Sequence, residues 1–423
     1  MNISLTTIEE LQLKVNQEKE RVTEWLKSKR LILQEEGQLL PIYSSFDIRD
    51  NGIKVAIVDS NLFPAGFNNL DPQARAKSIS AFKEYIPKIF DGHKILIIPE
   101  AHTRNKFYLS NLCALKNILM KAGYNVVIGS LRDDITGDGI NVEDSNGHII
   151  MLEKMRRDGC KLQTKSFDDG LILLNNDFSV KNPDLLDDIC HLVTPPLFLG
   201  WHHRRKSTHF MYYNQLIEEF SQMLHVDSWL LKTIYTVVDD VDFRTNETLS
   251  YVSQKVDQVI EGIKEKYDEY NIDSVPYVFI KDNSGTYGMG IISVSDGKEI
   301  LNLNNRKRNR MVFGKQKAQI NSVLIQEGIH TIHSVESYPA EPVLYSVGGA
   351  VVGGFMRIHS EKDNRTSLNA PGMKFDILLE GNITRPIIEQ QFDDSDLSLY
   401  AILADIANIA IAYEHKQNKE IEF

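Results

Sequence analysis

The sequence has no long hydrophobic run. None of its apolar stretches reaches the ~20 residues that a membrane-spanning helix needs. Residues 1–30 intersperse apolar residues with charges at helical spacing, which predicts an amphipathic helix, and they lack the continuous apolar core of a signal peptide. We therefore expect a cytoplasmic protein that has no contact with a membrane.

The chain also has little cysteine. Cys113, Cys160 and Cys190 are odd in number and far apart, and no CxxC pair occurs. This pattern argues against a disulfide framework and against a zinc site. The apolar neighbourhoods of all three favour buried thiols, and a reducing cytoplasm fits such usage.

Positive charge is in deficit. The chain has 47 lysines and arginines against 58 aspartates and glutamates, a formal net charge of −11. Because phosphate backbones repel an acidic surface, we expect no nucleic-acid partner. Arg204-Arg205-Lys206 and Arg306-Lys307-Arg308 are basic runs in this acidic chain. Each fits either a solvated face or a site that neutralises a small polyanion such as ATP.

The first half of the chain alternates apolar runs with helical patterns. Val55–Asp59, Lys94–Glu100, Asn125–Gly129 and Gly170–Asp177 are short apolar runs with the pattern of buried strands, and a helical pattern spans 111–123. This rhythm predicts a parallel α/β lobe. Ligands of open α/β sheets bind beyond the carboxyl ends of the strands, so the polar residues that follow these runs are candidate site residues.

The pattern changes near residue 275. Val275–Lys281, Ile291–Val294, Val323–Gln326 and Val343–Val347 are short strand patterns joined by turns that contain glycine. The predicted fold class is α/β (α+β), with a parallel α/β lobe followed by a β-rich lobe. We expect an N-terminal substrate lobe at 1–207, a helical connecting region at 208–270 and a β-rich nucleotide lobe at 271–423.

A glycine-rich segment follows the strand that ends at Lys281. Glycines let backbone N–H groups approach phosphate oxygens, and consecutive N–H groups form a concavity that binds anions. An ordinary hairpin turn has the same pattern, and no GK[ST] sequence opens a helix here. The lysine favours a phosphate-binding loop. The residues predicted to bind ATP here are Lys281, Ser284, Gly285, Thr286, Tyr287, Gly288 and Gly290.

Three later segments fit the same chemistry. Gln326, Glu327 and Gly328 form a polar hinge that can offer backbone groups to adenine and a carboxylate to ribose. Arg357 lies on a strand pattern, and its guanidinium suits a transferring phosphoryl group. The last segments offer oxygen ligands for Mg²⁺, although Glu380-Gly381-Asn382 fits a surface turn equally well. The predicted magnesium ligands are Asn369, Glu380 and Asn382.

The order of these segments resembles an ATP-grasp domain. The amino-acid sequences of three segments are similar to those of the proteobacterial glutamate–cysteine ligases: Asn61–Leu70, Val275–Gly290 and Leu368–Met373. This resemblance implies ATP and Mg²⁺ as cofactors, glutamate and cysteine as substrates, and γ-glutamylcysteine as product. Enzymes of this kind usually carry a second nucleotide-binding lysine. Lys232, Lys315 and Lys317 are the candidates, and nothing in their surroundings selects one.

Small zwitterions need cations for their carboxylates and acids or amides for their ammonium groups. Polar residues at the predicted strand ends supply both kinds. We choose Arg104 for the α-carboxylate of glutamate, because a guanidinium fork matches a planar carboxylate. Asn68-Asn69 also fits a turn, and the basic run also fits a helix start. The predicted substrate-binding residues are Asp59, Asn61, Asn68, Asn69, Glu100, Arg104, Asn176, Arg204 and Arg205.

Three functions fit these residues. In the first, ATP phosphorylates the γ-carboxylate of glutamate and the cysteine amine displaces phosphate, with Lys281 and Arg357 stabilising the transferring phosphoryl group. The second is another ATP-grasp ligase of a carboxylate and an amine, such as a glutathione synthetase-like or amino-acid ligase. The third is a nucleotide-binding regulator with a degenerate site, against which the presence of Lys281, Arg357 and Asn369 counts.

Overall fold

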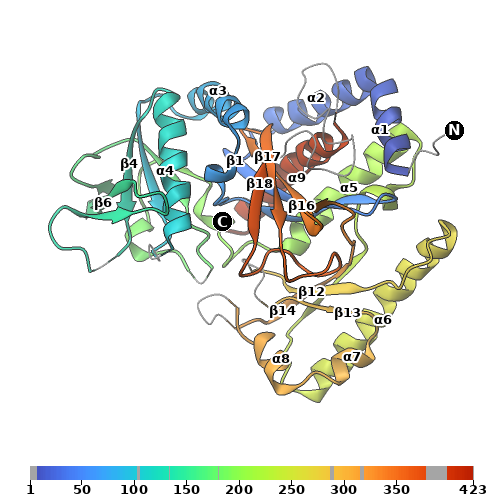
Figure 1. Ribbon diagram of the computed structural model, residues 1–423. Coiled ribbons are helices and arrows are strands. Elements are labelled where there is room, and N and C mark those ends of the chain that lie inside the picture. Colours follow the sequence, from blue (N-terminus) through green and yellow to red (C-terminus); the bar gives the residue numbers. More distant parts are fainter. Residues whose placement is uncertain are drawn as a thin grey trace.

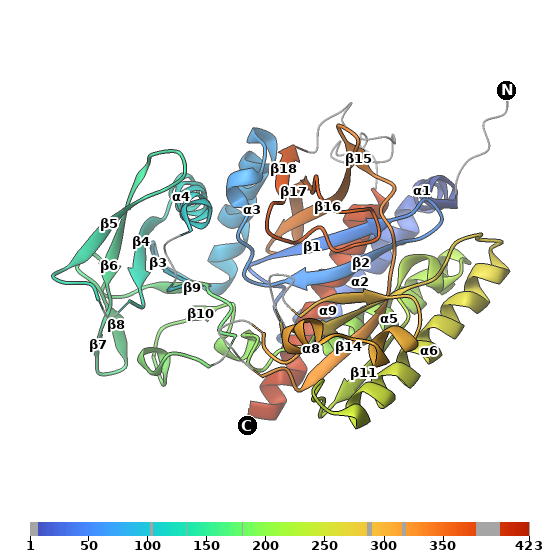
Figure 2. The same ribbon diagram turned by 60° about the horizontal axis from the view of Figure 1, so that its bottom comes forward.

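The chain folds around three β-sheets (Figures 1 and 2). None of the helices in its described part is both long enough and apolar enough to cross a membrane. The mixed α/β class predicted from the sequence is confirmed. The structure is a computed structural model that describes residues 7–101, 105–132, 134–179, 181–285, 290–314, 319–377 and 398–422.

The central sheet joins the two ends of the chain. Its strand order is β18-β17-β16-β1-β2, all neighbours being antiparallel, and β15 pairs with β16 at one end. The predicted strand at Val55–Asp59 is therefore real, but it lies here and not in the parallel sheet. The strands are β1 (Tyr43–Asp50), β2 (Val55–Asn61), β15 (Ser334–Val335), β16 (Tyr338–Val347), β17 (Ala350–Ile358) and β18 (Lys374–Ile377).

The second sheet is the predicted parallel one. Its order is β10-β9-β3-β4-β6-β5, and only β5 runs antiparallel to its neighbour. Buried aliphatic side chains on both faces of β3 explain its continuous apolar run. The elements of the second sheet, with helix α4 beside it and the hairpin β7–β8, are β3 (Lys94–Pro99), α4 (Lys106–Lys121), β4 (Asn125–Ser130), β5 (Gly139–Glu143), β6 (Ile149–Lys154), β7 (Arg156–Asp158), β8 (Lys161–Gln163), β9 (Leu171–Asn175) and β10 (Val193–Thr194). Helix α3 (Pro72–Ile89), which precedes β3, packs against β16 and β17 of the central sheet and against α4.

The third sheet is small and antiparallel, with order β11-β14-β12-β13. Strand β11 lies in the region expected to be helical, between two long helices. Helix α6 packs against the sheet through an apolar stripe of the kind that marks an amphipathic helix. The elements are β11 (Tyr235–Asp239), α6 (Asn246–Glu269), β12 (Val278–Asp282), β13 (Ile292–Val294), α7 (Lys298–Leu301), α8 (Asn305–Arg310) and β14 (Ser322–Glu327).

Helix α9 crosses the centre of the molecule and is apolar on nearly all sides up to Ala412, as expected of a helix surrounded by protein. It contacts the central sheet, α2 and α5. The remaining helices are α1 (Thr7–Gln17), α2 (Lys19–Glu35), α5 (Lys206–Leu224) and α9 (Leu399–Glu422), with the short 3-10 turns η1 (Phe67–Asn69), η2 (Asp184–Leu186), η3 (Leu197–Leu199) and η4 (Ser228–Leu231).

The cysteine prediction is wrong for two of the three residues. Cys160 and Cys190 form a disulfide, with their Cα atoms 5.3 Å apart. The backbone N–H of Cys190 also donates to the Cys160 carbonyl at 2.9 Å. The fold brings the β7–β8 turn against the segment before β10, a proximity that a sequence separation of 30 residues does not reveal. Cys113 is a free, half-buried thiol.

The predicted lobe boundaries at 207/208 and 270/271 stay predictions. The third sheet draws β11 from before the second boundary and β12 from after it. The central sheet likewise combines β1 and β2 with strands that follow residue 330. The lobes that bear on the site are thus spatial units built from segments distant in sequence.

Candidate active site

Three adjoining cavities form one cleft between the central sheet and the third sheet. The first and second share Asp47 and Asp59, the second and third share Phe279 and Ile291, and Asn369 lines all three. The third has a volume of about 550 Å³, within the range of small-molecule sites. A ligand with several parts can therefore extend from one cavity into the next.

Two carboxylates lie opposite each other in the cleft. Asp47 on β1 and Asp59 on β2 are directly paired across the two strands, so their side chains share one face of the sheet. Burial raises the pKa of Asp47, although Arg357 opposes this effect. Burial also acts on Asp59, but the cations Lys206 and Lys281 outweigh it and hold its pKa below the usual range. Asp59 was predicted from the sequence, and Asp47 was not, because the strand 43–50 was not recognised.

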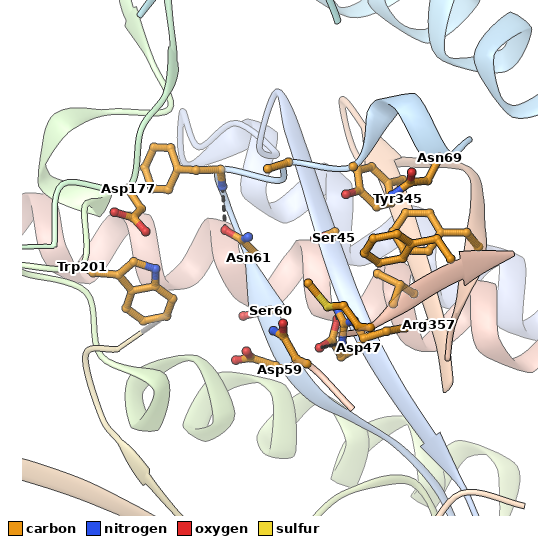
Figure 3. Close-up of a pocket in the computed structure, with 18 residues that line it drawn as sticks. Ser45, Asp47, Asp59, Ser60, Asn61, Asn69, Asp177, Trp201, Tyr345 and Arg357 are labelled. Carbon is orange, nitrogen blue, oxygen red and sulfur yellow. Dashed lines mark hydrogen bonds and ion pairs between the residues drawn. The ribbon is translucent and has the colours of Figure 1, made fainter. Parts of the chain in front are cut away.

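Arg357, predicted as catalytic, lies in the first cavity on β17 (Figure 3). Its Nη1 donates to Asp47 Oδ2 at 2.6 Å and to Glu341 Oε1 at 2.7 Å, and its Nη2 donates to Asp47 Oδ1 at 3.1 Å. Its buried Nε–H has no hydrogen-bond partner in the described part of the chain. The guanidinium is thus held rigidly by two carboxylates and keeps one donor for a ligand.

Two lysines complete the cationic side of the cleft. Lys281 is the last residue but one of β12, one residue before the strand end, and its Nζ donates to Gln326 Oε1 at 2.7 Å and to the Val58 carbonyl at 3.1 Å. Burial lowers the pKa of Lys281 to about 8, and the Asp59 carboxylate opposes this shift. Lys206, at the start of α5, forms an ion pair with Asp59. Sequence reasoning took Lys206 only as part of a basic run.

Lys206 reaches the cleft through its ion pair with Asp59 but lines none of the three cavities, whereas Lys307 and Lys362 line the third. Of the three candidates from the sequence, Lys232 pairs with Glu218 and lines none of the three cavities. Lys315 and Lys317 lie outside the described residues. The signal that was available is the position of Lys206 at the first residue of a helix after a polar turn.

The glycine-rich segment borders the cleft at its described ends. Ser284 donates from its backbone N–H and its hydroxyl to Asp282 Oδ1, at 3.0 and 3.2 Å, which fixes the turn after β12. Gly285 follows directly. Gly290 lines the third cavity with φ +65°, a conformation that favours glycine. Thr286, Tyr287 and Gly288 lie outside the described residues.

In the predicted hinge, Glu327 and Gly328 form more hydrogen bonds with other parts of the protein than expected. Glu327 is 1% exposed, and its oxygens accept from Lys54 Nζ at 2.8 Å, Trp229 Nε1 at 3.1 Å and the Ile234 N–H at 2.9 Å. With three protein donors on this carboxylate, the predicted contact of Glu327 with ribose is not supported. Its neighbour Gly328 donates its N–H to the Tyr277 carbonyl at 2.8 Å.

Gln326 keeps a place at the cleft. It lines the second cavity, where its side-chain oxygen accepts from Lys281 and its amide nitrogen donates to Thr233 Oγ1 at 3.0 Å. The hydrogen bond to Lys281 positions the amine beside the cavity. Both polar atoms of the Gln326 side chain therefore have protein partners, and its predicted contact with ATP stays a prediction.

Of the residues predicted to bind the amino acids, Asp59, Asn61 and Asn69 line the first cavity. Asn68 does not, because it donates to the Asn69 side chain at 2.9 Å. Asn176 does not either, because its side chain donates to the Pro99 carbonyl at 3.2 Å and accepts from the Phe178 N–H at 3.1 Å. Each of these two amides is bonded locally, and its predicted contact with the substrate stays a prediction.

The basic run is also structural apart from its lysine. Arg204 is buried and donates to both oxygens of Glu414, at 2.5 and 3.1 Å, and to Ser60, so it is not available to a substrate. Arg205 donates to backbone carbonyls of the turn that precedes α5. Glu100 lines none of the three cavities, and Arg104 lies outside the described residues.

Only one of the three predicted magnesium ligands lies among the residues that the structure describes. Asn369 lines all three cavities, while Glu380 and Asn382 lie outside the described residues. The first cavity offers a different oxygen set, the carboxylates of Asp47 and Asp59 with the nearby amide of Asn61. Carboxylate and amide oxygens are the protein ligands that Mg²⁺ prefers.

Comparisons with known proteins identify a family. The family model described as Glutamate-cysteine ligase matches residues 12–415. A protein from Methylobacillus flagellatus KT, provisionally named a gamma-glutamylcysteine synthetase, is 34% identical, with a TM-score of 0.87 over 99% of this chain and 98% of that one. No curated protein sequence matches the chain.

Two further solved structures are much less similar. D-alanyl-alanine synthetase A from Vibrio cholerae is 10% identical, with a TM-score of 0.34 over 77% of this chain and 81% of that one. A glutathione synthetase-like effector from Globodera pallida is 11% identical, with a TM-score of 0.37 over 87% of this chain and 84% of that one. Likeness this distant carries no argument. The family match and the Methylobacillus relative are sufficient, and the chain belongs to the glutamate-cysteine ligase family.

Proposed function

We propose that this ligase joins the γ-carboxylate of glutamate to the amine of cysteine inside the three-cavity cleft, by way of a γ-glutamyl phosphate. The observation that carries the proposal is the meeting of Lys281, Arg357 and the paired carboxylates Asp47 and Asp59 at adjoining cavities. Two cations suit the charge of a transferring phosphoryl group, and two acids suit the divalent cation that accompanies ATP.

ATP fits the second and third cavities. The third is large and lies beside Gly290, where the glycine-rich segment resumes. The second places Lys281 and Gln326 next to Asp59. The nucleotide would therefore lie with its base in the third cavity and its phosphates toward Lys281, Lys206 and Arg357.

Magnesium fits the donor set at the junction of the first and second cavities. Asp47 and Asp59 would hold the ion, and Asn369 remains a further proposed ligand from the loop that lines all three cavities. A bound Mg²⁺ supplies positive charge that neutralises the developing charge of the transferring phosphoryl group. Its charge would also stabilise the two acids that face each other on β1 and β2.

The reaction has two steps. A γ-carboxylate oxygen of glutamate attacks the γ-phosphorus of ATP, the bond to the bridging oxygen breaks, and ADP leaves. The neutral cysteine amine then attacks the acyl carbon, inorganic phosphate leaves with the electron pair of the C–O bond, and the nitrogen gives its proton to water. Arg357 and Lys281 act by holding charge and orientation, contributions that are typically worth ~10²–10³-fold in turnover for each donor.

Glutamate is placed in the first cavity, where Asn61 and Asn69 can receive its polar groups. Arg104 remains our proposed partner of the α-carboxylate, on the chemistry of its guanidinium fork alone. The test is Arg104→Lys, which keeps the charge and loses the fork. The glutamate KM should rise while the ATP KM stays the same. An effect on ATP alone would move Arg104 to the nucleotide.

The proposed reaction is tested with glutamate labelled with ¹⁸O in its γ-carboxylate. Incubated with ATP, Mg²⁺ and cysteine, the enzyme should form γ-glutamylcysteine and transfer one ¹⁸O atom to inorganic phosphate, because the acyl phosphate retains a carboxylate oxygen. Unlabelled phosphate would exclude this intermediate. A product formed only from γ-glutamylcysteine and glycine, or from another pair of amino acids, would favour the alternative ligase activities.

A further inference from the structure

A buried indole donor faces the first cavity. Trp201 is 2% exposed and lines this cavity, and its Nε1–H has no hydrogen-bond partner in the part of the chain that the structure describes. Buried donors are nearly always paired in proteins, so an unpaired one at a cavity wall points to a ligand acceptor. The ring is fixed in place, because Lys206 Nζ and the Arg204 guanidinium carbon lie 4.6 and 4.8 Å from its centroid.

A carboxylate lies beside this donor. Asp177 follows β9, is 4% exposed and lines the same cavity. The backbone N–H of Trp201 donates to the Asp177 carbonyl at 2.8 Å, which ties the two segments together. Asp177 Oδ1 accepts from Ser179 Oγ at 2.9 Å, and an ionised carboxylate has lone pairs for several donors. In Figure 3 Asp177 and Trp201 lie on one side of the cavity, and Arg357 and Tyr345 on the other.

Asp177 and Trp201 together give one wall of the cavity two kinds of polar group. Among the described residues that line the cavity, the acids are Asp47, Asp59 and Asp177, and the base is Arg357. The wall away from Arg357 therefore carries an acid next to an N–H donor, which suits a ligand group that has a cation and an anion on one carbon.

We propose that Asp177 and Trp201 form a clamp for the α-amino-acid group of glutamate. Asp177 receives the α-ammonium group, and Trp201 Nε1–H donates to the α-carboxylate. The clamp rests on the proposed function, because it takes glutamate as the acid that is phosphorylated at Arg357 and Lys281. It would make the enzyme specific for an α-amino acid over a plain dicarboxylate.

Glutamate fits this clamp better than cysteine does. The α-amino group of glutamate does not react, so it can stay bound as a cation to Asp177 while the γ-carboxylate extends toward Arg357. The amine of cysteine must be neutral to attack the acyl carbon. Holding it as ammonium on a carboxylate at the opposite wall would keep it charged and away from the reacting atoms. Tyr345 and Phe355 supply an apolar wall for the methylene groups of glutamate.

Two analogues test the halves of the clamp separately. Glutarate is glutamate without the α-amine, and 4-aminobutyrate is glutamate without the α-carboxylate. Binding of each to the whole protein is measured by calorimetry, by competition with glutamate. Asp177→Asn should weaken the binding of glutamate roughly 10- to 100-fold and leave the affinity for glutarate unchanged. Trp201→Phe should weaken the binding of glutamate to a similar degree and leave the affinity for 4-aminobutyrate unchanged. Asp184→Asn and Trp25→Phe are matched controls away from the cavity and should change neither.

Kinetics provide the second readout. Both variants should raise the glutamate KM while the KM values for ATP and cysteine remain within about twofold of the wild type, a size of change too small to signal a lost contact. The clamp is wrong if wild-type protein binds glutarate as tightly as glutamate, or if each variant weakens glutamate and its matched analogue equally. If the variants discriminate between glutamate and the analogues as expected but the enzyme forms no γ-glutamylcysteine from glutamate and cysteine, the clamp stands and the proposed reaction fails.

Discussion

Asp47 and Asp59 are direct cross-strand partners on β1 and β2, and both face the cleft. Like charges placed directly opposite in a sheet are destabilising. Arg357 pairs with Asp47 and Lys206 pairs with Asp59, so each acid has its own counter-ion. The two carboxylates are half-buried and lie at the junction of two cavities, where we propose that a divalent cation binds.

The magnesium assignment predicts that Asp59→Asn raises the Mg²⁺ concentration needed for half-maximal activity by about 10-fold or more, since loss of even a supporting partner typically costs 10–100-fold in metal affinity. The measurement is turnover against free Mg²⁺ at saturating ATP. Asp168→Asn, an exposed acid paired with Lys94, is the control. An unchanged Mg²⁺ dependence would show that Asp59 is not a ligand and would favour Asn369 and the residues after 377 as the magnesium ligands.

The pKa of Lys281 predicts an alkaline limit. Its charged form binds phosphate, and burial lowers its pKa from 10.5 to about 8. The amine is charged below pH 8 and loses its proton above it, so kcat/KM for ATP should fall as pH rises through about 8, because this ratio reports groups of the free enzyme. Lys281→Arg stays charged and should move the limit upward. If kcat/KM for ATP falls at the same pH in Lys281→Arg, the alkaline limit belongs to another group.

The same shift affects stability with a definite sign. Between pH 8 and 10.5 the unfolded chain retains a proton on Lys281 that the folded protein has lost. Stability therefore rises with pH across this window, because the unfolded state binds more protons. Activity and the stability contribution of Lys281 thus change in opposite directions there, which separates loss of ATP binding from unfolding.

Arg357→Lys should reduce kcat by roughly 10²–10³-fold, the usual effect of losing one preorganised donor at a developing charge. Lysine keeps a positive charge near Asp47 and Glu341, so the melting temperature should fall less than with Arg357→Ala, which removes the counter-ion of Asp47 and leaves Glu341 paired with Arg49 alone. Steady-state kinetics and melting curves of the two variants decide this. A normal kcat in Arg357→Lys would show that only the charge matters.

The buried pair of Lys54 and Glu327 should be a stability element. Lys54→Met leaves the Glu327 carboxylate buried without its cation, and removal of one partner of such a pair typically costs ~3–5 kcal/mol. Adding Glu327→Gln removes the charge while keeping an oxygen for Trp229 and Ile234, so the double variant should recover part of the loss. Urea denaturation of the set measures this. If Lys54→Met is as stable as the wild type, the pair with Lys54 does not stabilise the fold, and Glu327 would again be a candidate for contact with a nucleotide.

Sequence patterns located β3, β4 and β9 of the parallel sheet and most strands of the other two sheets, because buried strands leave apolar runs, but they did not locate β5, β6 and β10. They missed β1, whose sequence Tyr43–Asp50 is half polar although most of it is buried. Its charged side chains are Asp47, Arg49 and Asp50, and each forms an ion pair or a hydrogen bond with a distant segment. No local pattern reveals such partners.

Two residues that were chosen for their chemistry at strand positions, Lys281 and Arg357, line the cleft, and their roles in catalysis stay predictions. Arg204 and Glu327 have the same chemistry, but buried partners from α9 and from the β1–β2 turn occupy them. Which charged residues serve the fold and which serve a ligand depends on contacts across the whole chain.

The disulfide between Cys160 and Cys190 gives the last prediction. It closes a loop of 30 residues that contains β8 and β9, and β9 ends just before Asp177. By the chain-entropy relation, a loop of this length stabilises the fold by about 3–4 kcal/mol. Dithiothreitol should therefore lower the melting temperature of the wild type and leave Cys160→Ser unaffected, with Cys113→Ser as the control that still responds. If the bond also positions Asp177, reduction should raise the glutamate KM and not the ATP KM. An identical melting curve with and without reductant would show that the bond does not stabilise the fold.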